Sequence, residues 1–223
     1  MLDYFKLKSF IVFTILLSIN LIYSQSNNKF KPIDVFNLEY VSNPKISPDG
    51  KKVLYVRNFK DIMTDKNHSN IWIIDYDGKN NTPLTTGNKN DFDPTWSNSG
   101  DKFTYKSNSD DTVQLYLYAL GQKSNQKLTN LQNSVSSVDW SEDDKYLVFT
   151  SFVEKTSVSL IKMPEKPKGA KWNDPASEID GIKYRSDGRG YLNQGFSQVF
   201  ILPAEGGTPR QITFLKNNAS SPK

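Results

Sequence analysis

The sequence contains no cysteine and only one histidine, His68, among its 223 residues. Without cysteine there is no disulfide framework, no thiol nucleophile and no site for a lipid-modified cysteine. A metal site would depend on carboxylates, and the acidic residues match no calcium-loop pattern. We therefore expect no cofactor, no metal ion, and a fold that is stable through packing alone.

The sequence also lacks a Gly-x-Ser-x-Gly motif. The nearest segment, Gly195-Phe196-Ser197-Gln198-Val199, has no second glycine, and a nucleophile elbow needs small residues on both sides of its serine. The lone His68 lies in a polar stretch just before a predicted strand, where a solvated side chain is expected. No catalytic residue is predicted, and this chain alone is predicted to be inactive as an enzyme.

Charge of one sign is not concentrated anywhere in the sequence. The net charge is +4, but lysines and acidic residues are interspersed, and no basic stripe is interleaved with aromatics. Binding to nucleic acid is therefore not expected. The densest acidic clusters, at 91–93, 110–111 and 142–144, fall where turns or loops are predicted, so we expect them to be solvated.

The longest apolar run, from Phe10 to Tyr23, is shorter than the roughly 20 residues of a membrane span. Lys6 and Lys8 precede it, and the small residue Ser24 ends it before a polar stretch. This order predicts a signal peptide at residues 1–24, cleaved after Ser24, with an uncleaved N-terminal anchor as the alternative. The mature protein would then be secreted or periplasmic, without a stable membrane anchor.

Residues 25–38 form a lead-in to the rest of the chain. Pro32 suits a first helical position, and Val35 and Leu38 have helical spacing, so one short helix is predicted there.

A short phrase recurs along the chain at Pro44–Tyr55, Pro94–Tyr105 and Val138–Phe149. Each copy predicts a strand, a Ser-x-Asp/Ser-Gly type of turn and a second strand that alternates apolar and polar residues. Ser97 follows the first turn serine by 50 positions, and Ser141 follows after another 44. A four-stranded propeller blade takes about 40–45 residues.

A second phrase recurs out of phase with the first, at Ser69–Thr85, Gln114–Thr129 and Ser197–Thr213. It predicts the third and fourth strands of each blade, joined by a hairpin that contains glycine. The third unit is about 40 residues longer than the second, which places an insertion at about residues 155–196.

The insertion contains a Pro/Lys-rich loop and a predicted hairpin with an Asp-Gly turn. Long loops on a rigid scaffold are where binding residues concentrate, so the substrate-gating candidates are Tyr184, Arg185 and Asp187. Arg185 and Asp187 could meet a peptide terminus. The favoured alternative is that these two side chains pair with each other across the hairpin.

The predicted fold class is all-β: a partial β-propeller of about three four-stranded blades over residues 39–223. Trp72, Trp96 and Trp140 are expected to pack between blades, with unequal burial. The final residues, Ser220–Lys223, align with Ser42–Lys45, so we expect a chain truncated before ring closure. Its third blade would have an unpaired outer edge near residues 212–214 and would promote self-association.

Four segments of the sequence also resemble a known family. Residues 34–50, then 169–172, 182–192 and 205–213, are similar in order and spacing to the N-terminal propeller of prolyl oligopeptidase-family serine peptidases. The nearest branch is the acylaminoacyl-peptidase and dipeptidyl-peptidase-like one, and the resemblance covers roughly residues 30–223. It implies a parent whose α/β-hydrolase domain, with its Ser, Asp and His, is missing from this chain. No catalytic residue of the family maps onto any position here.

The resemblance implies a substrate-gating propeller of a secreted serine peptidase that hydrolyses short peptides, with peptide substrate reached through the missing hydrolase domain. The alternative is a non-enzymatic periplasmic propeller of the Tol-system type that binds proteins. A scaffold or surface-attachment module is a third option. The insertion favours the peptidase, because a plain binding propeller would keep an even repeat.

Export should remove residues 1–24 because the basic start, short apolar run and small residue match what signal peptidase recognises. Intact-mass measurement of the exported protein checks this. A mature chain that still begins at Met1 and stays in the membrane fraction would contradict it.

Overall fold

The structure, a computed structural model, describes residues 29–155, 164–173, 182, 184–188 and 190–222. The predicted signal peptide at 1–24 lies outside these ranges. Within them, no helix is long and apolar enough to cross a membrane. The chain divides into two compact units, Met1–Leu38 and Glu39–Lys223.

The first unit contains a single described helix, the 3-10 helix η1 (Pro32–Asn37), where the sequence predicts a short helix. The backbone N–H of Lys31 donates to the Asp34 carboxylate at 2.8 Å, which satisfies a donor at the start of the helix.

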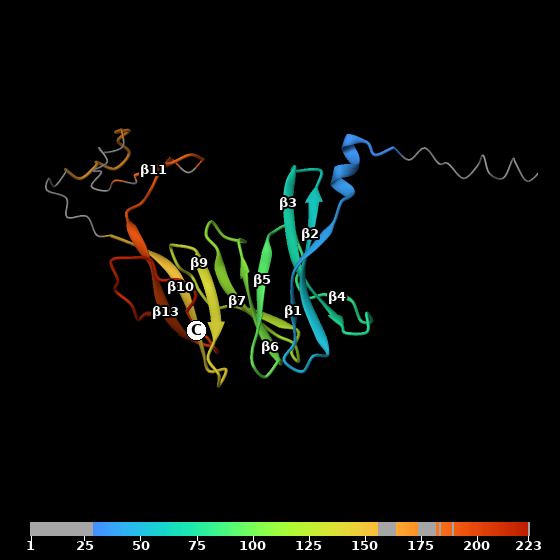
Figure 1. Cartoon of the computed structure of the whole chain (residues 1–223). Helices are drawn as coiled ribbons and strands as arrows, with labels where there is room; N and C mark the ends of the chain where they lie inside the picture. Colours follow the sequence, from blue (N-terminus) through green and yellow to red (C-terminus); the bar gives the residue numbers. More distant parts are fainter. Residues whose placement is uncertain (1–28, 156–163, 174–181, 183, 189, 223) are drawn as a thin grey trace, which may run out of the picture. The chain divides into compact units, whose positions relative to one another are not determined.

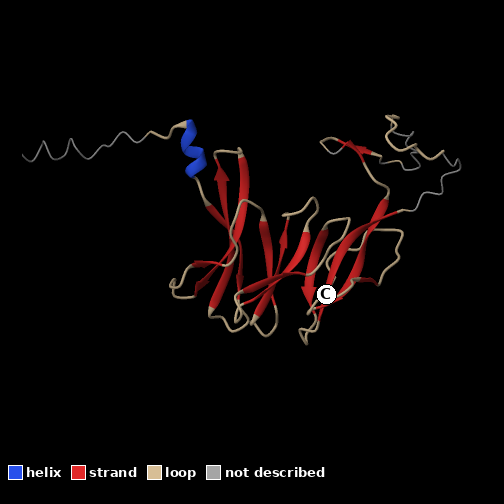
Figure 2. Cartoon of the chain, turned by 180° about the vertical axis from the view of Figure 1, so that it is seen from behind, coloured by secondary structure: helices blue, strands red, loops and turns tan. Residues whose placement is uncertain are grey.

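The second unit contains three antiparallel sheets of four strands each (Figure 1). Strands follow one another in sequence order across every sheet, and apart from η1 the described residues are strands and connecting loops (Figure 2). This confirms the predicted all-β blades. The first blade consists of β1 (Tyr40–Ile46), β2 (Lys52–Asp61), β3 (Lys66–Asp75) and β4 (Thr82–Pro83). The second consists of β5 (Asp91–Trp96), β6 (Lys102–Ser107), β7 (Gln114–Ala119) and β8 (Ser124–Lys127). The third consists of β9 (Val135–Trp140), β10 (Tyr146–Glu154), β13 (Gly195–Pro203) and β14 (Arg210–Gln211).

A small hairpin interrupts the third blade between β10 and β13. It pairs β11 (Arg185–Ser186) with β12 (Gly190–Tyr191), and Gly188 supplies a positive φ of 76° in the turn. The hairpin lies within the predicted insertion and has the predicted Asp-Gly turn.

The turn serine has the same role in the first and third blades although the turn sequences differ. Ser47 Oγ accepts the N–H of Lys52 at 2.9 Å and donates to Asp49 at 2.6 Å. Ser141 Oγ accepts the N–H of Tyr146 at 2.9 Å and donates to a carboxylate two residues on at 2.7 Å. The hydroxyl therefore closes the turn whether glycine or aspartate ends it.

A threonine that follows the outer strand continues its hydrogen bonding in each blade. In the second blade, Thr129 Oγ1 accepts the N–H of Leu115 at 2.9 Å and donates to Gln114 Oε1 at 2.8 Å. In the third, Thr213 makes the same two bonds with Val199 and Gln198, both at 2.8 Å. These side chains satisfy strand backbone that the short outer strands leave unpaired.

The blades pack face to face, and the alternation of strand side chains decides which residues meet. Between the first two blades, one buried cluster comprises Leu54, Val56, Ile71, Ile73, Phe103, Tyr105 and Tyr118. Between the second and third, another comprises Leu115, Leu117, Leu128, Val135, Trp140, Leu147, Phe149, Leu202 and Ala204. The core is thus divided between the two blade interfaces.

Two tryptophans join successive blades by the same hydrogen bond. Trp96 Nε1 donates to the carbonyl of Lys45 at 2.9 Å, and Trp140 Nε1 donates to the carbonyl of Thr95 at 3.2 Å. Each tryptophan directly precedes its turn serine, and each acceptor lies two residues before the turn serine of the preceding blade. The predicted position between blades is confirmed for both.

Trp72 does not pack between two of the described blades. Its neighbours Ile71 and Ile73 face the second blade, so strand alternation places Trp72 on the opposite face of the first sheet. The three exposures are unequal, as expected: Trp140 is 8% exposed, whereas Trp72 and Trp96 are half-buried.

The acidic clusters are not all solvated. Asp91 lies in β5 and is 0% exposed. Asp144, at a positive φ of 56°, accepts the N–H groups of Asn98 at 2.7 Å and Ser99 at 2.8 Å in the preceding blade's turn. Burial opposes its ionisation, but the hydrogen bonds from Ser99 and Asn98 together hold the pKa of Asp144 below its usual value.

The outer edge of the third blade is not a special feature. The strands β4, β8 and β14 each occupy the outer edge of their own sheet, so an unpaired outer edge is common to all three blades. Among the described residues, no strand of the first sheet pairs with the third, and no ring is closed. The end blades therefore differ from the middle one in their faces, not in their edges.

The substitution Asp144→Asn should destabilise the protein at pH 7 by about 1–3 kcal/mol, the range for hydrogen bonds to a charged group and for a buried donor left unmade. Because the pKa of this carboxyl is depressed in the folded state, the stabilisation is present above the ordinary aspartate pKa of 3.8. It is lost as the pH falls through the folded-state pKa. Urea unfolding at pH 7 and near pH 3 measures the change.

The control is Glu142→Gln, in the same turn but exposed. It should change the free energy of unfolding by less than about 0.5 kcal/mol. Equal effects of the two variants, or no effect of Asp144→Asn, would contradict the inter-blade role.

Candidate functional site

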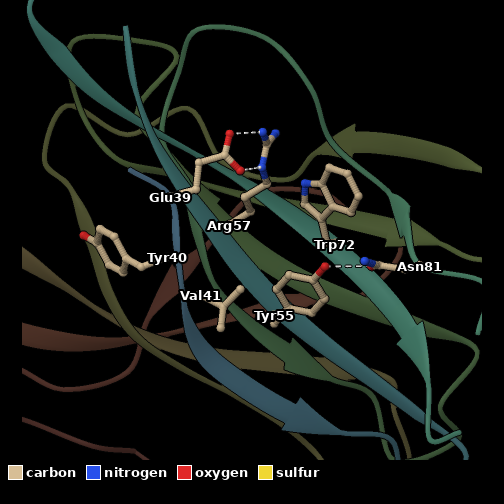
Figure 3. Close-up of a pocket in the computed structure, with 7 residues that line it drawn as sticks. All are labelled: Glu39, Tyr40, Val41, Tyr55, Arg57, Trp72 and Asn81. Atoms are coloured by element: carbon tan, nitrogen blue, oxygen red, sulfur yellow. Dashed lines mark hydrogen bonds and ion pairs between the residues drawn. The ribbon is translucent and has the colours of Figure 1, made fainter. Parts of the chain in front are cut away.

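A cavity of about 590 Å³ opens on the first blade, on the face that points away from the second (Figure 3). Residues from the start of β1, from β2 and β3, and from the connection after β3 line it. They are Glu39, Tyr40, Val41, Tyr55, Arg57, Trp72 and Asn81.

An ion pair lies over the aromatic floor of this cavity. Arg57 donates through two nitrogens to both oxygens of Glu39, with Nε to Oε2 at 2.7 Å. Its guanidinium carbon lies 5.3 Å from the centre of the Trp72 ring and 5.4 Å from that of Phe59, within cation–π range. The hydrogen bond from Arg57 holds the pKa of Glu39 below its usual value, so this carboxylate is unsuited to proton transfer near neutral pH.

The remaining groups are aromatic or apolar. Tyr55 stacks on Trp72 at 6.4 Å and donates its hydroxyl to Asn81 at 2.7 Å. Trp72 Nε1 is buried without a hydrogen-bond partner. Tyr40 and Val41 are 64% and 67% exposed. With no nucleophile and no free base, this arrangement supports binding and not catalysis.

The predicted substrate-gating residues lie on the β11–β12 hairpin and line neither this cavity nor the second one. Tyr184 stacks on Tyr191 at 6.3 Å, Arg185 lies opposite Tyr191 in the strand register, and Asp187 is in the turn. No ion pair joins Arg185 to Asp187 in the described part of the hairpin, so the favoured pairing of these two residues is not found.

A second cavity, of about 670 Å³, lies where the start of β3 meets the β4–β5 connection and the segment after β6. His68 lines it and is 8% exposed. The expectation of a solvated histidine is wrong because β2 and β3 pair as far as Asp61 and Lys66, which places His68 inside the hairpin opposite Phe59.

Metal binding finds no support in the described residues. Across those ranges, no three His, Asp or Glu side chains come close enough together to hold a metal ion.

A β-propeller consists of four-stranded antiparallel sheets whose strands follow sequence order and which pack face to face. The three blades described here have this arrangement, and tryptophan hydrogen bonds join the first strands of successive blades. The chain belongs to the TolB beta propeller domain family, PD40, whose family model matches residues 35–172.

Known relatives include peptidases. The chain is 28% identical over 191 residues to the uncharacterized peptidase YuxL of Bacillus subtilis, covering 85% of this chain and 28% of that protein. It is 25% identical over 117 residues to dipeptidyl-peptidase 5 of Porphyromonas gingivalis, covering 52% of this chain and 17% of that one. The chain thus spans less than a third of the length of these relatives.

Solved structures agree on the fold. The acylaminoacyl peptidase of Pyrococcus horikoshii matches with a TM-score of 0.59 at 17% identity, covering 79% of this chain and 25% of that one. The sequence resemblance to peptidase propellers is therefore confirmed, as is the partial-propeller fold.

A double-mutant cycle of Glu39→Gln and Arg57→Gln should give a coupling energy of about 1 kcal/mol, because the pair is bidentate but half-exposed. Urea unfolding of the four proteins measures it. The exposed pair Asp77–Lys79 serves as the control. A coupling above about 3 kcal/mol would indicate that this face is covered, against the open cavity described here.

Proposed function

We propose that this chain is the substrate-gating propeller part of a secreted serine peptidase that hydrolyses short peptides. The main support is the similarity to a peptidase along 85% of this chain. The fold shared with an acylaminoacyl peptidase agrees with it.

In this proposal the chain contributes no catalytic group. Acyl transfer requires a nucleophile, a base and an oxyanion site in one place. The sequence has a single histidine and no nucleophile elbow, so a hydrolase domain outside this chain supplies the triad. Peptide substrate is the partner, and it is reached through that domain.

The connections between second and third strands would form the gate. The β2–β3, β6–β7 and β10–β13 connections follow equivalent strands and so leave the blades at the same end. The third is the long one that contains β11 and β12. We assign Tyr184, Arg185 and Asp187 as gating residues because they lie on this extension and all three side chains are available to a ligand.

Export follows from the signal peptide proposed at 1–24. A cysteine-free chain needs no disulfide to be stable outside the cytoplasm, and the cleaved protein would keep no membrane anchor. Interspersed charges give no support for nucleic acid as a partner.

The second candidate function is a periplasmic, protein-binding propeller of the Tol type. The family description favours it, and so does the aromatic cavity of the first blade, which could take a partner side chain. This function would need no hydrolase domain.

The test has two parts. The reading frame that contains this chain should continue through further blades into a hydrolase domain with Gly-x-Ser-x-Gly, Asp and His. The protein made from that whole frame should cleave dipeptidyl or aminoacyl chromogenic substrates, whereas this chain alone should not.

In the whole protein, Arg185→Ala and Asp187→Ala should reduce the preference for short over long peptides by roughly tenfold, equivalent to about 1.4 kcal/mol. The rate on short substrates should not change. Lys168→Ala, in the exposed Pro/Lys loop, is the control. Turnover by this chain alone, or a frame without a hydrolase domain, would contradict the proposal and favour the Tol-type function.

A further inference from the structure

Four Asp-Gly pairs occur in the sequence, at 49–50, 77–78, 180–181 and 187–188. The pair at 180–181 lies outside the described residues, and the other three occupy turns. In such a pair the backbone nitrogen of the glycine can attack the aspartate Cγ, because glycine has no Cβ that hinders the approach. The three described turns can therefore be compared for the two groups that this reaction uses, the carboxyl and the amide nitrogen.

The glycines of the three turns are alike in conformation and in surroundings. The φ angles of Gly50, Gly78 and Gly188 are 71°, 84° and 76°. No atom lies within 4 Å of the position that a Cβ would take at any of them. Crowding around the glycine does not distinguish the pairs, whereas the hydrogen bonds of the reacting groups do.

In the first pair, both reacting groups are held by hydrogen bonds. The carboxylate of Asp49 accepts from Ser47 Oγ at 2.6 Å and from the N–H of Lys51 at 3.1 Å. The attacking group, the N–H of Gly50, donates to the carbonyl of Ser47 at 2.9 Å. The hydrogen bond from Ser47 also holds the pKa of Asp49 below its usual value, and an ionised carboxylate is a poor electrophile.

The second pair is restrained in the same way. Asp77 accepts from the N–H of Lys79 at 3.0 Å and forms an ion pair with Lys79 Nζ at 2.9 Å. The N–H of Gly78 donates to the carbonyl of Asp75 at 2.9 Å. The hydrogen bond from the Lys79 side chain holds the pKa of Asp77 below its usual value, which again favours the unreactive carboxylate.

The pair in the β11–β12 hairpin has neither restraint. Within the described part of the chain, the Asp187 carboxylate has no hydrogen bond or ion pair, and the N–H of Gly188 has no acceptor. Both residues are exposed. Only two residue pairs join β11 to β12, whereas the turns of Asp49 and Asp77 adjoin β2 and β3, which pair along ten residues each. A turn with so few bonds samples more conformations.

We propose that Asp187-Gly188 is a site of isoaspartate formation in the folded protein. The Gly188 nitrogen bonds to Cγ of Asp187, and the carboxyl oxygen leaves as water with the amide hydrogen, which closes a five-membered succinimide. Water then adds to one of the two ring carbonyls and breaks its bond to the nitrogen. Opening at the main-chain carbonyl gives isoaspartate, and opening at Cγ restores aspartate. One water leaves and one enters, so nothing is oxidised or reduced and the mass of the chain is unchanged.

The product alters one of the gating candidates. Isoaspartate adds one carbon to the main chain between β11 and β12, and its free carboxylate is attached directly to Cα. The aged hairpin would therefore present the charge of residue 187 from a different position. An effect on the gate rests on the proposed function, whereas the isomerisation itself does not.

Ageing of the full chain at neutral pH and physiological temperature, over several weeks, tests the proposal. Samples are digested with a protease that cuts after lysine. The peptide 184–216 then contains Asp187 as its only aspartate, and Asp180 falls on a separate peptide. Chromatography separates the isoaspartyl and aspartyl forms of equal mass, and electron-transfer fragmentation locates the altered residue.

Isoaspartate should form at Asp187 roughly tenfold faster than at Asp49 or Asp77, because at least one charge-assisted hydrogen bond must break at those two before attack. In the chain unfolded in guanidinium chloride, the three rates should be similar. Lys79→Met should raise the rate at Asp77 and leave that at Asp187 unchanged. The matched control Asp187→Glu keeps the charge but should stop the reaction in peptide 184–216, because glutamate cannot close the five-membered ring.

Equal rates at the three pairs in the folded chain would overturn the proposal. So would an absence of isoaspartate at Asp187 in folded protein when the unfolded chain forms it. A difference that persists unchanged in guanidinium chloride would assign the selectivity to local sequence and also count against the structural argument. A frame without a hydrolase domain would overturn the peptidase proposal but leave the isomerisation standing, so the two failures are distinguishable.

Discussion

The packing of one blade's face against the next is the constraint on which the rest of this structure depends. A four-stranded sheet with apolar residues on both faces cannot bury either face by itself, so each blade depends on contact with a neighbouring blade. The two core clusters lie at these contacts. The indole hydrogen bonds of Trp96 and Trp140 fix the inner strands at a repeated offset, because the acceptor occupies the same repeat position both times.

This stacking also forms the second cavity. His68 belongs to the first blade and Asn108 to the second, and they line one cavity because β3 and the segment before β5 lie side by side. Ser69 forms a bridge with Asn90, and its N–H donates to the carbonyl of Lys89 at 3.1 Å. A polar cavity can persist at a blade interface because the apolar packing a few residues away supplies the stability that unpaired polar atoms reduce.

The recurrence of two phrases is enough to predict the blades, since turn serines and alternating strands are local patterns. The limits appear where a role depends on the neighbouring blade. Asp144 looks like a solvated turn residue until the preceding turn is placed beside it, and its two backbone donors come from 45 and 46 residues earlier. His68 looks like a loop residue in the sequence because the stretch around it is polar. Its place in β3 becomes visible only when β2 and β3 are paired, which sets His68 opposite Phe59. The proposal that Tyr184, Arg185 and Asp187 act as a gate follows from loop length alone, and the structure adds only that Arg185 and Asp187 are not paired to each other.

The last residue of the first recurring phrase differs in burial from blade to blade, according to whether another described blade packs against it. Tyr105 and Phe149 occupy this position in the second and third blades and are fully buried against the preceding blade. In the first blade the position holds Tyr55, which is half-buried and bonds to Asn81. Arg57 then lies over the adjacent Trp72, with its charge compensated by Glu39. Within the described residues, this face of the first blade therefore has an aromatic floor, formed by Tyr55 and Trp72, and a charged rim, formed by Glu39 and Arg57.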